Sequence, residues 1–159
     1  MKVIDNFLPD YNFKQLQSFV TGEEFPWYYF RGAVYEGDGL YQFTTSFFTD
    51  GKKNMLFPII EPCVVKLGIR NLIRIKANLQ MKTIFHRKQP YHIDYTDDPP
   101  IKTAILYINT NNGWTQFKKG GKVKSVENRI VIFDSNLDHQ GVTCTDEDTR
   151  VVVNFNWEE

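Results

Sequence analysis

The sequence predicts a mainly β domain, a small barrel or double-sheet jelly roll braced by helices. From residue 71 onward the chain consists of short runs that alternate apolar and polar residues or are rich in strand formers. Turn signals built on glycine and asparagine separate these runs. Both helical patterns precede them, so the strands are expected to form the body of the domain.

Two helices are expected in the first half of the chain. Asp10 is the expected N-cap of a short helix that carries Phe13, Leu16 and Val20 on one stripe and ends near Gly22. A second helix is expected over residues 59–67, where Gly68 stops it. Pro62 leaves the start of this second helix open, because proline lacks the amide hydrogen that a helix interior needs.

An aromatic hairpin is expected between the helices. Residues 25–30 are largely aromatic, residues 36–39 (Glu-Gly-Asp-Gly) are typical of a turn, and residues 41–48 partly alternate as a return strand. Asp50-Gly51 predicts a further turn. We expect residues 27–48 to form a mobile hairpin that covers the functional site, since its aromatic flanks need a partner surface.

The second half predicts five strands, at residues 72–81, 101–109, 114–117, 129–133 and 150–157. Asn112-Gly113 is the strongest short hairpin signal and predicts that the second of these strands turns directly into the third. Gly120-Gly121 predicts another turn, and Asp97-Asp98-Pro99-Pro100 predicts a rigid loop.

Length and composition narrow the class of protein. At 159 residues the chain is expected to be a single domain, residues 1–159, with a sizeable core. Nineteen basic and nineteen acidic residues give formal neutrality, which removes the electrostatic case for non-specific nucleic-acid or membrane binding. The two cysteines, Cys63 and Cys144, lack metal-type spacing and are expected to be reduced thiols. Without a signal-peptide or membrane-spanning pattern, the expected location is the cytoplasm.

Four residues in the second half carry the functional signal. His92 and Asp94 are two residues apart, so on an extended strand their side chains leave the same face. His139 follows 45 residues after Asp94, and Arg150 follows 11 residues after His139. Two histidines and one carboxylate are the ligand set of non-haem Fe(II) oxygenases, with three metal positions left open. Arg150 adds a planar fork that suits the carboxylate of a small dicarboxylate.

The last predicted strand has an unusual polar face. Arg150, Val152, Asn154 and Asn156 share one face, while the alternate residues are apolar. One explanation is that this face lines a water-accessible pocket, because buried polar groups require partners. The alternative is a sheet with one face exposed to solvent. The histidines and Asp94 favour the pocket.

His92-Ile93-Asp94, His139 and Arg150, with Tyr107 on the intervening strand, resemble the Fe(II)- and 2-oxoglutarate-dependent oxygenase superfamily. The resemblance is to the small prolyl 4-hydroxylase-like members, of the short type found in phages, and covers almost the whole chain. It implies a double-stranded β-helix that belongs to the jelly-roll and cupin-like barrels, and a location in the host cytoplasm if the protein is phage-encoded.

The resemblance also implies cofactors and their contacts. His92, Asp94 and His139 would bind Fe(II) and be the catalytic residues, with O2 as oxidant and ascorbate as a further candidate requirement. Arg150 would bind the distal carboxylate of 2-oxoglutarate. The expected co-substrate contacts are Arg150, Tyr107, Asn78, Gln80 and Asn154, of which Asn78 and Gln80 replace a tyrosine found in relatives.

The expected reaction is hydroxylation of a substrate C–H bond, with release of succinate and CO2. A prolyl residue in a peptide or protein is the first candidate substrate. The alternatives are the same chemistry on a nucleobase or small molecule, and a non-catalytic, cupin-like metal-binding module. Neutral net charge favours a peptide over a nucleic acid. His86 lies in a polar loop and is expected to be a surface residue and not a ligand.

Overall fold

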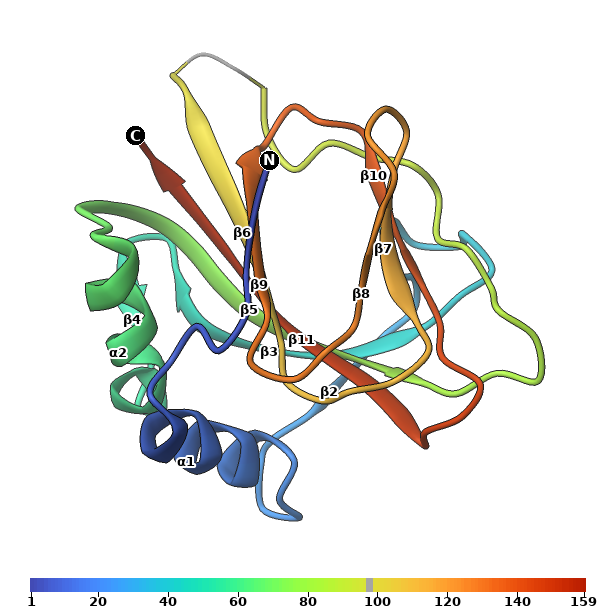
Figure 1. The fold of residues 1–159 in the computed structure, drawn as a ribbon, viewed down its shortest axis with the longest axis horizontal. Helices are drawn as coiled ribbons and strands as arrows, with labels where there is room; N and C mark the ends of the chain where they lie inside the picture. Colours follow the sequence, from blue (N-terminus) through green and yellow to red (C-terminus); the bar gives the residue numbers. More distant parts are fainter. Residues whose placement is uncertain (97–98) are drawn as a thin grey trace.

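Two antiparallel sheets form the framework of the computed structural model, which describes residues 1–96 and 99–159 (Figure 1). The larger sheet has the strand order β1-β9-β6-β11-β5-β3-β2, with β4 paired to β3, and the smaller sheet has the order β10-β7-β8. The larger sheet consists of β1 (Lys2–Ile4), β2 (Tyr28–Phe30), β3 (Gln42–Thr49), β4 (Lys52–Lys53), β5 (Asn71–Met81), β6 (Ile101–Tyr107), β9 (Ile130–Asp134) and β11 (Thr149–Glu158). The smaller sheet consists of β7 (Trp114–Phe117), β8 (Lys122–Lys124) and β10 (His139–Val142).

The arrangement confirms the predicted fold class, a jelly-roll barrel braced by helices. Figure 1 shows the smaller sheet on one side of the barrel, across from β1, β6 and β9, with both helices outside the larger sheet. The predicted loop residues Asp97 and Asp98 lie outside the described residues. Neither helix in the described ranges is long and apolar enough to cross a membrane.

The helices form close to where the sequence predicts them. Helix α1 (Asp10–Val20) buries Phe13, Leu16 and Val20 as expected, but Pro9 and not Asp10 is its N-cap. Asp10 occupies the first turn, where its charge suits the positive end of the helix dipole. Helix α2 (Phe57–Leu67) begins two residues earlier than predicted, because Pro58 lies in the first turn, where a missing N–H costs nothing. It ends at Gly68, whose φ of 68° is left-handed.

Two hydrophobic clusters cover opposite faces of β11. Val151, Val153, Phe155 and Trp157 pack outward into a cluster that includes the buried residues of α1 and α2. Val152 points the other way, into a smaller cluster with residues of β6, β7, β8 and β9. The polar face of β11 is therefore turned into the barrel and not toward solvent, as the pocket explanation requires.

Two of the turns predicted from the sequence are present in the structure. Gly120 and Gly121, with φ of 119° and 87°, connect β7 to β8 as predicted. Asp50 and Gly51, with φ of 49° and 73°, form the two-residue turn between β3 and β4.

The predicted hairpin at Asn112-Gly113 is wrong. Strand β6 pairs with β9 and β11, whereas β7 pairs with β8 and β10, so the chain crosses from one sheet to the other here. Gly113 does not have the positive φ that a two-residue hairpin would need. A Cβ added at Gly113 would lie 2.8 Å from Cδ of Arg150. A glycine is therefore needed here because the chain packs closely against Arg150. In the sequence, this glycine looks the same as one that a local turn would need.

The aromatic hairpin is present as β2 and β3, with Tyr28 opposite Thr44 and Phe30 opposite Gln42. At its tip, the Asp38 carboxylate folds back and accepts backbone N–H groups of Ala33 and Val34 at 2.9 and 2.8 Å. These hydrogen bonds lower the pKa of Asp38, although burial opposes them. These contacts brace the loop at the tip of the hairpin, whose mobility stays a prediction.

Candidate metal and co-substrate site

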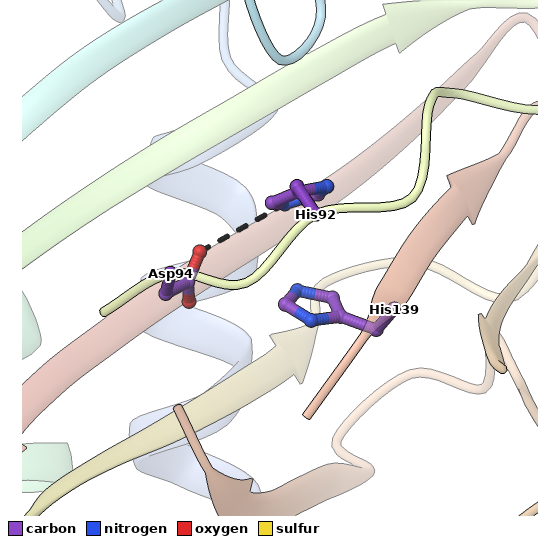
Figure 2. Close-up of side chains that lie close together, drawn as sticks. All are labelled: His92, Asp94 and His139. Carbon is purple, nitrogen blue, oxygen red and sulfur yellow. Dashed lines mark ion pairs between the residues drawn. The ribbon is translucent and has the colours of Figure 1, made fainter. Parts of the chain in front are cut away.

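The chain brings His92 and His139 together through backbone pairing. The His92 N–H donates to the carbonyl of His139 at 3.0 Å, and the His139 N–H donates to the carbonyl of His92 at 3.0 Å. Residues that face each other in such an antiparallel pair project their side chains to the same side. The two ring centroids lie 4.5 Å apart (Figure 2). The Asp94 N–H donates to the Ser135 carbonyl at 3.0 Å, which fixes the third predicted ligand beside them.

These three side chains form a group that could hold a metal ion. One ligand atom from each of His92, Asp94 and His139 lies within 4.8 Å of the others. The Nε2 atom of His92 is 3.8 Å from Oδ1 of Asp94. His86, expected at the surface, is exposed and bonds through Nδ1 to the carbonyl of Thr143 at 2.7 Å.

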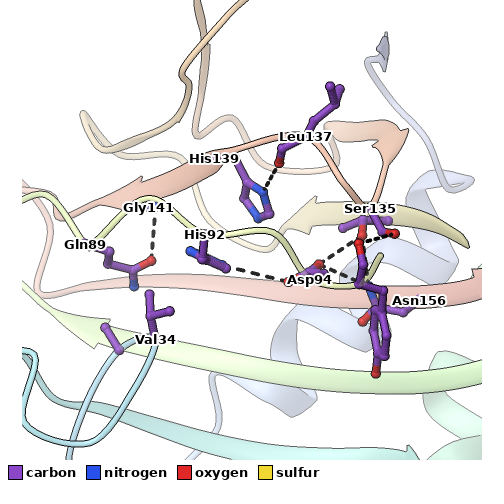
Figure 3. A network of polar contacts seen from close by, with 12 residues as sticks. Val34, Gln89, His92, Asp94, Ser135, Leu137, His139, Gly141 and Asn156 are labelled. Carbon is purple, nitrogen blue, oxygen red and sulfur yellow. Dashed lines mark hydrogen bonds and ion pairs between the residues drawn. The ribbon is translucent and has the colours of Figure 1, made fainter. Parts of the chain in front are cut away.

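Backbone carbonyls orient both imidazoles. Nδ1 of His139 lies 2.9 Å from the Leu137 carbonyl (Figure 3). Nδ1 of His92 lies 3.2 Å from the Pro90 carbonyl. A carbonyl can only accept, so each Nδ1 is the donor in its contact, which leaves each Nε2 free for a metal ion. Burial lowers the pKa of His139, which keeps that imidazole neutral, the form that binds metal.

The Asp94 carboxylate is held from the opposite side. Its Oδ2 accepts from Oγ1 of Thr103 at 2.9 Å and from Nδ2 of Asn156 at 3.0 Å. Burial alone would raise the pKa of Asp94, but His139, Arg74 and the Asn156 bond together hold it below its ordinary value. Oδ1 makes no hydrogen bond within the described chain and faces His92, as a ligand oxygen would. Supporting contacts of this kind are typical of metal sites.

A cavity of about 230 Å³ opens beside the triad, and its walls are mostly polar. Ala33 and Val34 of the hairpin loop line it, so the loop does lie over the site. The polar lining residues include Arg74, Lys76, Asn78, Gln80, Thr115, Arg150 and Asn154.

Arg150 lines the cavity as a buried guanidinium without a carboxylate. Its Nε donates to Oγ of Ser125 at 3.0 Å, and one terminal nitrogen donates to Oγ1 of Thr115 at 3.2 Å. No ion pair involves Arg150 among the described residues, and burial lowers its pKa. A guanidinium has five N–H donors, so several remain for an anion in the cavity.

Tyr107 lies against Arg150, with its ring 5.7 Å from the guanidinium carbon. Its hydroxyl donates to Oγ1 of Thr115 at 2.8 Å, and burial raises its pKa so that the phenol stays protonated. Thr115 lines the cavity beside Arg150. The Tyr107 hydroxyl bonds to Thr115 and therefore lies one side chain away from the cavity.

The three predicted amide contacts all line the cavity. Oδ1 of Asn78, Oε1 of Gln80 and Oδ1 of Asn154 are buried and have no hydrogen-bond partner within the described chain. Gln80 faces Arg150 across the β5–β11 pair, and Asn78 faces Val152. Buried amide oxygens without partners are costly, which favours a hydrogen-bond donor from a ligand or water between them.

Sequence reasoning missed several residues of this site. Arg74 and Lys76 have the same parity on β5 as Asn78 and Gln80. The alternating pattern of this strand could therefore have identified them as residues of the same face. Thr103 and Asn156 face each other on β6 and β11. Thr115 and Ser125 had no local signal, because they reach Arg150 only through the packing of the two sheets.

Comparisons with known proteins establish the fold. No protein-family model matches the chain, and no curated protein sequence matches it significantly. A prolyl hydroxylase from Trichoplax adhaerens, solved with a peptide fragment of the hypoxia inducible factor oxygen degradation domain, has a TM-score of 0.69 at 13% identity, covering 99% of this chain and 83% of its own. A prolyl-4-hydroxylase from Pseudomonas putida has a TM-score of 0.63 at 14% identity, covering 99% and 92%. HygX from Streptomyces hygroscopicus, solved with nickel and 2-oxoglutarate, has a TM-score of 0.65 at 11% identity, covering 98% and 81%. The resemblance seen in the sequence therefore holds for the fold.

Proposed function

We propose that this chain is an Fe(II)- and 2-oxoglutarate-dependent dioxygenase. One observation carries the proposal: a single cavity is lined both by the His92, Asp94 and His139 cluster and by the buried, unpaired Arg150 guanidinium. A cupin-like binding module has no need of a second, cationic anchor for a dicarboxylate beside its metal. The shared fold of 2-oxoglutarate oxygenases supports the same assignment.

The donor set fits a ferrous ion. Two imidazole nitrogens and one carboxylate oxygen from one side leave further metal positions open toward the cavity. When bound, Fe(II), 2-oxoglutarate and O2 supply the oxidising chemistry, with succinate and CO2 released. The chain's own part is to hold the ligands by the Leu137, Pro90, Thr103 and Asn156 contacts and to place a substrate C–H bond next to them.

Arg150 is assigned to the distal carboxylate of 2-oxoglutarate. A bidentate, charge-assisted contact would satisfy donors that are otherwise buried without an anion. Thr115, already bonded to both Arg150 and Tyr107, would orient the fork. Asn78, Gln80 and Asn154 are assigned to the flanks of the co-substrate because all three line the cavity.

A prolyl residue in a peptide or protein is the first candidate substrate. Two of the similar structures are prolyl hydroxylases, one of them with a peptide bound. The β2–β3 hairpin adds exposed aromatic side chains beside the loop that lines the cavity, including Tyr28 and Tyr29 with 66% and 60% of their surface accessible. Aromatic surfaces of this kind suit peptide recognition.

Succinate formation from 2-oxoglutarate tests the proposal. Wild-type protein with Fe(II) and ascorbate should form succinate, and proline-containing peptides should stimulate it whereas oligonucleotides should not. Asp94→Ala should abolish turnover, because it removes the anionic ligand. Asp148→Ala, which removes an exposed carboxylate paired with Lys82, should retain it. Turnover that survives Asp94→Ala would refute the triad, and stimulation by oligonucleotides alone would refute only the prolyl substrate.

A further inference from the structure

Lys76 is a half-buried cation that the site described above does not use. It lies on β5 opposite Asn154 of β11 and lines the cavity. Its ammonium makes no hydrogen bond and no ion pair with any described residue. Burial, and to a lesser degree the charge of Arg74, lowers its pKa to about 8, so the group is mostly charged at neutral pH. A mostly charged, half-buried amine without a hydrogen bond or ion pair is costly, and an anion in the cavity would offset that cost.

The cationic side chains that line the cavity outnumber its carboxylates, and Lys76 is the excess cation. Arg74 has an anionic neighbour, since its terminal nitrogen lies 3.8 Å from Oδ1 of Asp94. In the proposed function, Arg150 and the metal ion take the two carboxylates of 2-oxoglutarate. No lining carboxylate other than Asp94 occurs among the described residues of the cavity. Asp94 also attracts Lys76, but Arg74 and, in the proposed function, the metal ion share that carboxylate, so Lys76 has no carboxylate of its own.

The strand register separates Lys76 from the co-substrate anchor. Arg150 pairs with Gln80, four residues along β5 from Lys76. At about 3.3 Å per residue this corresponds to roughly 13 Å. The four C–C bonds of 2-oxoglutarate span roughly 5 Å, since three bonds of extended chain span at most about 3.6 Å. Lys76 and Arg150 therefore extend into the cavity from backbone positions that are farther apart than the co-substrate is long.

We propose that Lys76 binds a carboxylate carried by the substrate that is hydroxylated, with Asn154 opposite it on β11. This inference rests on the proposed function and narrows the substrate to molecules that present an anionic group near the reacting C–H bond. A free amino acid and a peptide with a carboxyl-terminal proline both offer that chemistry. An internal prolyl residue without a nearby acid does not.

Matched acid and amide probes test the inference by binding. Protein loaded with Ni(II), which keeps turnover from occurring, and with 2-oxoglutarate is titrated calorimetrically with N-acetyl-L-proline and with N-acetyl-L-prolinamide. A second pair, tetra-alanyl-proline as free acid and as amide, distinguishes a peptide source from a single amino acid. We expect the acid of at least one pair to bind about tenfold to a hundredfold more tightly than its amide, as for a charge-assisted hydrogen bond.

Two substitutions test whether Lys76 causes the preference for the acid over the amide. Lys76→Met, which keeps the length of the side chain and removes its charge, should reduce the acid-to-amide ratio to near one. Lys119→Met, at an exposed position in the β7–β8 turn, is the matched control and should keep the wild-type ratio. The inference is overturned if no acid binds better than its amide, or if Lys76→Met keeps the preference. It is also overturned if Lys76→Met weakens 2-oxoglutarate binding as much as Arg150→Ala does. Failure of wild-type protein to bind 2-oxoglutarate would instead refute the proposed function, and this inference with it.

Discussion

Replacing Lys76 by methionine should stabilise the unloaded protein. Burial lowers the pKa of Lys76 from its ordinary 10.5 to about 8, so the charged amine is tolerated less well in the folded chain than in the unfolded chain. At about 1.36 kcal/mol per pH unit, this difference corresponds to about 3 kcal/mol of destabilisation at pH 7. Methionine has a similar shape and no charge, so Lys76→Met should recover most of that amount, or roughly 6–12 °C in the melting temperature.

The pH dependence of the stability tests whether the charge of Lys76 causes the destabilisation. Below pH 8 the amine is protonated in both states, and the full penalty applies. Between pH 8 and 10.5 the folded chain has lost the proton while the unfolded chain keeps it, so wild-type stability should rise toward that of the variant. Urea unfolding at pH 7 and at pH 10, followed by tryptophan fluorescence, measures both values. Equal or lower stability of Lys76→Met at pH 7, or a gain that persists unchanged at pH 10, would refute the reasoning. Lys119→Met should change stability by less than about 0.5 kcal/mol.

Three further substitutions test individual contacts of the site. Arg150→Ala should weaken 2-oxoglutarate binding about tenfold to a hundredfold in calorimetry, and an unchanged Kd would place the anchor elsewhere. Asn156→Ala removes the 3.0 Å bond to Asp94 and should weaken Fe(II) binding about tenfold, which a competition titration with a chelator would measure. Gly113→Ala places a Cβ 2.8 Å from Cδ of Arg150 and should destabilise the fold by about 1–3 kcal/mol in urea unfolding while weakening 2-oxoglutarate binding; a neutral effect on both would show that Arg150 can move aside freely.

Local patterns in the sequence predicted much of the fold because their causes are local. The alternation on β5 and β11 identifies two strands and the face of each that turns into the barrel. Gly68 ends α2 where a left-handed residue is needed, and Gly120-Gly121 makes the β7–β8 turn. His92, Asp94, His139 and Arg150 could be selected as a group because they are rare residue types at suitable spacings.

What the sequence could not provide depends on contacts between distant segments. Asn112-Gly113 resembles a hairpin turn, but strand pairing in two different sheets decided its conformation. Thr115 and Ser125 bond to Arg150 only because the smaller sheet packs across from β11. Lys76 has the parity of the polar face of β5, but only the closed barrel shows that its half-buried amine lines the cavity without a hydrogen bond or ion pair to a described residue.

The central claim is that one cavity binds a ferrous ion and 2-oxoglutarate together. The most direct measurement is an anaerobic calorimetric titration of 2-oxoglutarate into the protein with and without Fe(II). We predict one 2-oxoglutarate per chain, with markedly tighter binding when Fe(II) is present, because the metal held by His92, Asp94 and His139 and the Arg150 guanidinium line the same cavity. Absence of binding, or binding with the same affinity in the metal-free protein, would contradict the claim.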